Sequence, residues 1–292
     1  MSSFNVKNKI HADDDYQSDI SGTDDMKAAN QIRFYRDSQI KGVEACNVIS
    51  STHKFPRHSH ENIYAISFME SGGSYWNDNK KSASLVLPGN IAVINPGQIH
   101  SGEPAENQSS TYKMLYLDRS LFIQNTFCPQ FKNIINNDPH LPELFKILHN
   151  SILNDSEQLE KEIHLTNFIG KLMETYSLPL VKPEKISRER DLIKRASEYL
   201  SEDLDRKMTL EELSRQTGFS PYHFLRLFKK STGVAPHHFR TQKRIERAKN
   251  LIIEGLSFSE VALATGFSDQ SHFSNTFRNY MGCTPRQYYL GV

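Results

Sequence analysis

Apolar positions change their spacing along the chain, and each change predicts a different kind of element. Between residues 31 and 120, short apolar runs such as 63–69 are separated by turns rich in Gly, Pro and Asn, for example SGGS at 71–74 and NPGQ at 95–98. Short strands with turns of this kind are typical of an antiparallel sandwich or barrel. We therefore predict a β-domain over residues 31–138.

From residue 139 the spacing becomes helical. Apolar residues recur at i, i+3 and i+4, first between residues 141 and 152 and then between 159 and 176. The second helix has two interpretations: it covers one face of the β-domain, or it pairs with a second copy of the chain. We assign residues 139–176 as a helical dimerisation segment and expect Ile169 and Leu172 to face the second copy.

Two segments lack this periodicity. Residues 1–30 are polar and acidic, and we predict that they form a disordered tail. Residues 177–187 contain Pro179 and Pro183, which push the residues before them out of the helical region. We predict a linker there, followed by a second, all-helical domain over residues 188–292.

The composition excludes several classes of protein. With 24% charged and 37% apolar residues, the chain of 292 residues is neither a disordered polymer nor a membrane protein. No apolar run is long enough to span a bilayer, and the first residues lack the apolar core of a secretion signal. Three widely spaced cysteines argue against a disulfide framework or a cysteine zinc site. We expect a cytoplasmic protein that does not contact a membrane.

The net charge of +1 conceals an asymmetry between the C-terminal third and the rest of the chain. Residues 187–292 carry 17 Lys or Arg against 12 Asp or Glu, whereas the remainder carries an acidic excess. A basic C-terminal third indicates either a polyanionic partner or a solvated helical surface.

An internal repeat in this basic region carries the strongest functional signal. The segment TLEELSRQTGFS at 209–220 returns as SFSEVALATGFS at 257–268, and the sequences that follow also match after a shift of one residue. In each copy a glycine, Gly218 or Gly266, can stop a short helix, and a serine, Ser220 or Ser268, can cap the next helix. A helix, a glycine-containing turn and a second helix form a helix-turn-helix, whose second helix fits the DNA major groove.

The second helix of each copy has a polar face with residues suited to base recognition. Gln and Asn can bond an adenine edge, Arg a guanine edge, and Leu or Tyr can contact a thymine methyl group. One such copy alone is equally compatible with an ordinary bundle surface. Two copies joined by one long helix, over about residues 236–254, favour DNA binding.

Residues 188–292 resemble the DNA-binding domain of AraC-type (AraC/XylS) transcriptional regulators, through GFSPYHFLRLFKKSTGVAP in the first copy and GFSDQSHFSNTFRNYMGCTPRQY in the second. The resemblance implies seven helices, two recognition helices in successive major grooves of double-stranded DNA, and contact with RNA polymerase, more often for activation than for repression. It places Cys283 in the core. By position, it implies the base-reading candidates Tyr222, Leu225, Arg226, Gln270, Ser271, His272, Ser274 and Asn275.

Residues 55–104 resemble the cupin-like sensor domain that often precedes this DNA-binding domain, through FPRHSHENIYAISFMESGGSYW and LVLPGNIAVINPGQIHSGEP. His58, His60 and His100 correspond to the three His ligands of metal-dependent cupins, but Tyr64 occupies the position of the expected Glu. We assign these three His, with Tyr64 and Trp76, to an effector-binding pocket and assign no metal or cofactor. No triad, phosphate loop or paired carboxylate indicates catalysis.

The sequence therefore predicts a two-domain α+β protein with a cupin-like β-barrel, a helical dimerisation segment and an all-α double helix-turn-helix domain. The predicted function is a ligand-responsive, homodimeric DNA-binding regulator that senses a small-molecule effector and is not an enzyme. Two alternatives remain: a metal-dependent cupin enzyme fused to a DNA-binding module, and a constitutive DNA-binding regulator whose barrel only dimerises.

Overall fold

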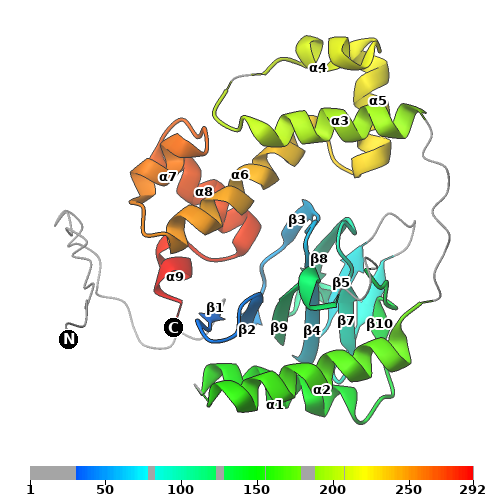
Figure 1. The fold of residues 1–292 in the computed structure, drawn as a ribbon, viewed down its shortest axis with the longest axis vertical. Helices are drawn as coiled ribbons and strands as arrows, with labels where there is room; N and C mark the ends of the chain where they lie inside the picture. The colour runs from blue at the N-terminus through cyan, green and yellow to red at the C-terminus, as the bar shows by residue number, and fades with distance from the viewer. Residues whose placement is uncertain are drawn as a thin grey trace.

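The computed structural model describes residues 31–77, 83–122, 128–154, 156–178, 188–206 and 208–291. The chain forms a β-domain flanked by two helices and a separate group of helices (Figure 1). This arrangement confirms the two-domain α+β fold class. The expected tail over residues 1–30 and most of the expected linker over 177–187 lie outside the described residues.

Two antiparallel sheets build the β-domain. The larger sheet has the order β1-β2-β9-β4-β7-β10, and the smaller sheet has the order β3-β8-β5-β6. The strands of the larger sheet are β1 (Gln31–Arg36), β2 (Val43–Ser51), β9 (Ser110–Asp118), β4 (Ile63–Ser71), β7 (Ile91–Ile94) and β10 (Ile134–Ile135). The strands of the smaller sheet are β3 (Phe55–His58), β8 (His100–Pro104), β5 (Ser74–Asn77) and β6 (Ser84–Val86).

Strand β4 shows how the larger sheet divides two cores. Successive side chains on a strand point to opposite faces. Tyr64, Ile66 and Phe68 therefore enter one core with the helices α1 (Leu141–Leu153) and α2 (Gln158–Tyr176). Ala65 enters a different core, on the face of the sheet that meets the C-terminal helices.

The C-terminal helices carry the repeat seen in the sequence. Their bounds are α3 (Arg188–Glu202), α4 (Leu210–Thr217), α5 (Pro221–Thr232), α6 (Pro236–Ile253), α7 (Phe258–Ala264), α8 (Gln270–Met281) and α9 (Pro285–Leu290). Helices α3 to α5 and the start of α6 pack around Phe224 and Phe228 as a core of their own. The later helices pack around Phe273 and Phe277, and this core continues into the larger sheet. The second helix-turn-helix is thus docked on the β-domain.

Helices α1 and α2 lie along the side of the β-domain opposite the C-terminal helices (Figure 1). Leu165, Phe168 and Leu172 of α2 are buried in the core of their own chain, and Ile169 is partly buried against it. The expectation that Ile169 and Leu172 face a second copy is therefore wrong, because the helix uses that stripe to cover the sheet. Its exposed apolar residues are Leu159 (67% exposed) and Ile163 (49% exposed).

In the described part of the chain, no helix combines the length and apolarity that a bilayer crossing requires.

Candidate functional site

Local sequence signals position the first recognition helix, α5. The preceding helix α4 begins with a capping box, in which the side chain of Thr209 accepts from the backbone N–H of Glu212 and that of Glu212 accepts from the N–H of Thr209. Gly218 ends α4 with a φ of 72°, in the left-handed region that favours glycine. Ser220 then caps α5 by accepting from the backbone N–H of His223 at 3.4 Å, and Pro221 occupies the first turn.

The second recognition helix, α8, uses a different cap from the one expected. Asp269, rather than Ser268, accepts from the backbone N–H of His272, at 2.7 Å. The turn of the second copy is one residue longer, so the capping position moves along by one. Ser268 instead donates to the Asp269 carboxylate at 2.8 Å. A carboxylate at a helix N-terminus also interacts favourably with the helix dipole.

The exposed faces of the two helices carry the base-reading candidates. Tyr222 is 77% exposed, and Leu225 and Arg226 are exposed beside it. On α8 the exposed candidates are Gln270, Ser271, His272 and Asn275, and Ser274 is half-buried. None of these side chains is needed to fill the two helix-turn-helix cores, so this surface is free to contact DNA.

A cavity of about 370 Å³ lies between the β-domain and the C-terminal helices. This volume falls within the range of small-molecule pockets. Its lining is mostly apolar, with a group of imidazoles among the polar residues. Lining residues include Trp76, Met114 and Tyr116 from the β-domain and Ile245, Lys249 and Tyr280 from the helical domain.

His58, His60 and His100 come together at this cavity. His58 on β3 lies opposite His100 on β8 in the smaller sheet, and the two ring centroids are 4.1 Å apart. The His60 ring lies 4.9 Å from that of His58 and 5.3 Å from that of His100. Burial lowers the pKa of all three imidazoles, most strongly for His60 and His100, so they are neutral near pH 7.

Tyr64, which the sequence assigned to the same pocket, does not line it. The Tyr64 ring lies in the core beneath α1 and α2, and its hydroxyl donates to the backbone carbonyl of Pro129 at 2.6 Å. The assignment of Tyr64 to the pocket is therefore wrong. Successive side chains of β4 point to opposite faces of the sheet, so Ala65 lines the cavity and Tyr64 points away from it.

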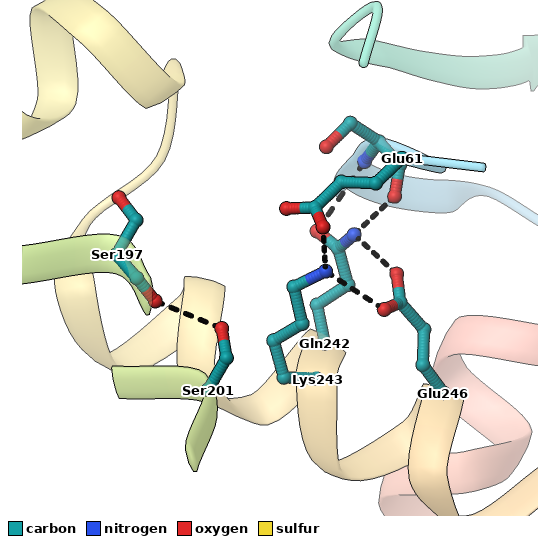
Figure 2. Close-up of polar contacts among 7 residues, drawn as sticks. Glu61, Ser197, Ser201, Gln242, Lys243 and Glu246 are labelled. Carbon is teal, nitrogen blue, oxygen red and sulfur yellow. Dashed lines mark hydrogen bonds and ion pairs between the residues drawn. The ribbon is translucent and has the colours of Figure 1, made fainter. Parts of the chain in front are cut away.

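Polar contacts join the imidazole-bearing segment to helix α6. The side chain of Gln242 bonds both backbone groups of Ser59: its amide nitrogen donates to the carbonyl, and its oxygen accepts from the N–H at 3.3 Å. Lys243 pairs with Glu61 and with Glu246, each at 2.9 Å (Figure 2). Burial lowers the pKa of Lys243, but Glu246 and Glu61 raise it to a net value above the ordinary one.

A second polar junction centres on Glu44 of β2. Its carboxylate accepts from Arg36 at 2.8 Å, from the Tyr288 hydroxyl at 3.0 Å and from Lys249 at 3.3 Å. These donors come from β1, α9 and α6. Burial lowers the pKa of Lys249, but the charge of Glu44 raises it to a net value above the ordinary one, so Lys249 stays protonated. One carboxylate therefore links both domains.

Comparison with known proteins identifies the family. Residues 42–169 match the AraC-like ligand binding domain, and residues 213–289 match a helix-turn-helix domain. The chain is 29% identical over 237 residues to the uncharacterized HTH-type transcriptional regulator YbfI of Bacillus subtilis, covering 79% of this chain and 85% of that one. It is 29% identical over 209 residues to the probable transcriptional regulator LumQ of Photobacterium leiognathi, covering 71% and 82%. The chain is an AraC-type transcriptional regulator.

The fold of this AraC-type regulator also resembles a solved structure. The apo form of a ToxT variant from Vibrio cholerae aligns with a TM-score of 0.54 and 15% sequence identity, over 89% of this chain and 97% of that one. At this identity the likeness shows a shared two-domain fold. It confirms the fold class expected from the sequence. The matched helix-turn-helix domain and the relatives named as transcriptional regulators confirm the expectation of a regulator rather than an enzyme.

The sequence of this AraC-type regulator did not reveal that residues of helix α6 line the cavity. Gln242, Lys243 and Lys249 appear in the sequence only as polar residues of a basic helix. Their partners Ser59, Glu61 and Glu44 lie some 180 to 205 positions earlier in the chain. No periodicity or motif links such distant positions, so only the folded structure brings them together.

Proposed function

We propose that the chain is a ligand-responsive regulator, in which a small molecule in the cavity alters DNA binding by the two recognition helices. One observation carries the proposal: the cavity wall is built from both domains, with Tyr116 on one side and Lys249 and Tyr280 of the DNA-binding domain on the other. A molecule in such a cavity contacts both domains. Its binding energy therefore depends on how the two domains are arranged.

The regulatory effect follows from thermodynamic linkage between ligand binding and DNA binding. A ligand that favours one arrangement of the domains shifts their equilibrium only by its difference in affinity for the two arrangements. If DNA also prefers one of them, ligand and DNA change each other's affinity by the same factor. Helix α6 is suited to transmit this coupling, because it holds Gln242 and Lys249 at the cavity and joins the two helix-turn-helix units.

The proposed partners are double-stranded DNA, a small-molecule effector, RNA polymerase and a second copy of the chain. For DNA, we propose that Arg226, Gln270 and Asn275 read bases, supported by their exposure on the recognition helices. For the homodimer, support comes from Leu159 and Ile163, apolar residues on α2 that its own chain leaves exposed. Activation through RNA polymerase is carried over from the family resemblance.

The test is a thermal-shift screen of the full chain against a panel of cytoplasmic metabolites, followed by DNA binding with each stabilising compound. A ligand that binds only the folded state stabilises it by RT ln(1 + [L]/Kd), about 2.7 kcal/mol at one hundred times Kd. We expect at least one compound to raise the melting temperature and to change DNA affinity by fivefold or more, about 1 kcal/mol of coupling.

A matched variant separates cavity binding from binding elsewhere. Ala65→Leu adds bulk to the cavity wall and should abolish the thermal shift, whereas Ala264→Leu, on the exposed part of α7, should leave it unchanged. Stabilising compounds that leave DNA affinity unchanged would favour the constitutive alternative, in which the β-domain only dimerises. Failure of DNA binding itself would reject the regulator as proposed.

A further inference from the structure

The three imidazoles at the cavity form a set with the spacing of metal ligands. One nitrogen from each of His58, His60 and His100 lies within 4.8 Å of the others. We propose that these residues bind a single divalent transition-metal ion of the zinc, cobalt, nickel or copper class. The inference rests on the proposed function in one respect, namely that the site opens into the effector cavity.

The hydrogen bonds of two rings leave the correct nitrogen free for a metal. Nδ1 of His58 contacts the carbonyl of Pro56 at 2.7 Å, and Nδ1 of His100 contacts the carbonyl of Gln98 at 3.1 Å. A carbonyl can only accept, so each Nδ1 carries the proton and each Nε2 keeps a lone pair. Metal-binding histidines are oriented by the same kind of second hydrogen bond, from the other ring nitrogen to a carbonyl or carboxylate.

The third ring has no competing partner. Within the residues that the structure describes, the His60 side chain makes no hydrogen bond, and its ring is half-buried beside the other two. A neutral imidazole has one ring nitrogen that accepts, so His60 can also offer a lone pair to a metal ion. Each of the three rings therefore has one nitrogen available as a ligand.

The chemistry of the set restricts the ion. Three neutral nitrogen ligands with no carboxylate among them favour borderline ions such as zinc over calcium or magnesium, which prefer oxygen. Bonds of about 2.1 Å in a tetrahedral site place ligand nitrogens about 3.4 Å apart, so the rings must rotate inward slightly on binding. Three protein ligands leave a fourth position, and the cavity is the side from which an effector oxygen or a water can fill it.

The test uses tag-free full-length protein, stripped with a chelator and titrated with cobalt(II). We expect close to one equivalent to bind, with the intense visible absorption of a tetrahedral or five-coordinate site, and zinc to displace it. His60→Ala and His100→Ala should each weaken binding by 100-fold or more, since loss of even an outer-shell partner costs about 10–100-fold. His140→Ala, which removes an exposed histidine before α1, is the matched control and should bind like the wild type.

The outcomes decide the proposal without reference to effector binding. Absence of cobalt binding, or unchanged binding in both trio variants, overturns it. If an alanine variant does not fold, electron spin echo measurements on copper-loaded wild type still count the imidazole ligands, and fewer than two overturns the proposal. Thermal shifts by organic compounds are measured separately on chelator-treated protein. If the protein binds organic compounds but no metal ion, this inference is rejected and the proposed function stands. If it binds a metal ion but no organic compound, only the proposed organic effector is rejected.

Discussion

The side chain of Gln242 forms two hydrogen bonds with the backbone of Ser59, the residue between His58 and His60. A residue of the DNA-binding domain thus holds the segment that bears two of the three cavity imidazoles. A comparable contact lies on the other strand of the pair, where Ile99, next to His100, packs against Gly233 so closely that a Cβ there would collide with it. The two segments that bear the cavity imidazoles thus contact helix α6 and the glycine that ends α5.

Replacing Gln242 with alanine should uncouple the two domains. The variant leaves the N–H and carbonyl of half-buried Ser59 without their partner, which weakens the docking of the two domains by about 1–3 kcal/mol. We expect the ratio of DNA affinities with and without a stabilising ligand to fall towards one, measured by fluorescence anisotropy. Gln216→Ala, which removes an exposed glutamine on α4, is the control. An unchanged ratio in the Gln242 variant would show that the signal takes another route.

Arg226 should contribute to sequence preference. Its exposed position on α5 allows a bidentate contact with guanine, and Arg226→Ala should weaken specific binding by about 1–3 kcal/mol and relax the preference at one base pair. The measurement compares the specific site with random DNA of equal length. Equal losses on both would identify Arg226 as a phosphate contact. Lys194→Ala, which removes an exposed lysine of α3 outside the recognition helix, should change neither.

The sequence predicts the helix-turn-helix units well because their signals are local. Glycines with positive φ, capping side chains and buried phenylalanines lie within a few positions of one another, so Gly218 and Phe224 can be placed from the sequence alone. The cap of α8 was misplaced by one residue because Ser268 and Asp269 are both good caps. Only the hydrogen bond to His272 distinguishes them.

The cavity was predicted less well, for physical reasons. Strand β4 is buried on both faces, so its apolar run has no polar side to show that Tyr64 points away from the imidazoles. The orientation of the amphipathic helix α2 was also hard to predict, because apolar residues lie on more than one of its sides. Its apolar residues divide between Leu172, which faces the sheet, and Leu159, which faces solvent, and the helical period alone does not separate them.

The exposed face of α2 should form the dimer contact. Ile163→Glu places a charge on an apolar surface residue, and we expect a folded monomer in sedimentation with weaker binding to a site of two half-sites. Leu172→Glu instead buries an unpaired carboxylate and should unfold the β-domain. A dimer that survives in Ile163→Glu and in Leu159→Glu would show that another surface makes the contact.

His149 on α1 should make the folded protein sensitive to acid. Its ring is fully buried, stacked on Phe145, and its Nε2 contacts the carbonyl of Cys46 at 3.3 Å. Burial lowers the pKa of His149 to about 4 from an ordinary 6.5, an effect that nearby Lys113 strengthens and Glu70 weakens.

The direction of the pH effect follows from this lowered pKa. The unfolded chain binds a proton at His149 below pH 6.5, whereas the folded chain resists it until about pH 4, so stability falls as the pH drops through this window. The contribution is at most about 3 kcal/mol. Urea unfolding between pH 7 and pH 4.5 should show a shallower loss for His149→Gln than for the wild type, while His164→Gln, on the outer side of α2, should follow the wild type. Parallel curves for His149→Gln and the wild type would place the acid sensitivity in other groups, among them the three cavity imidazoles.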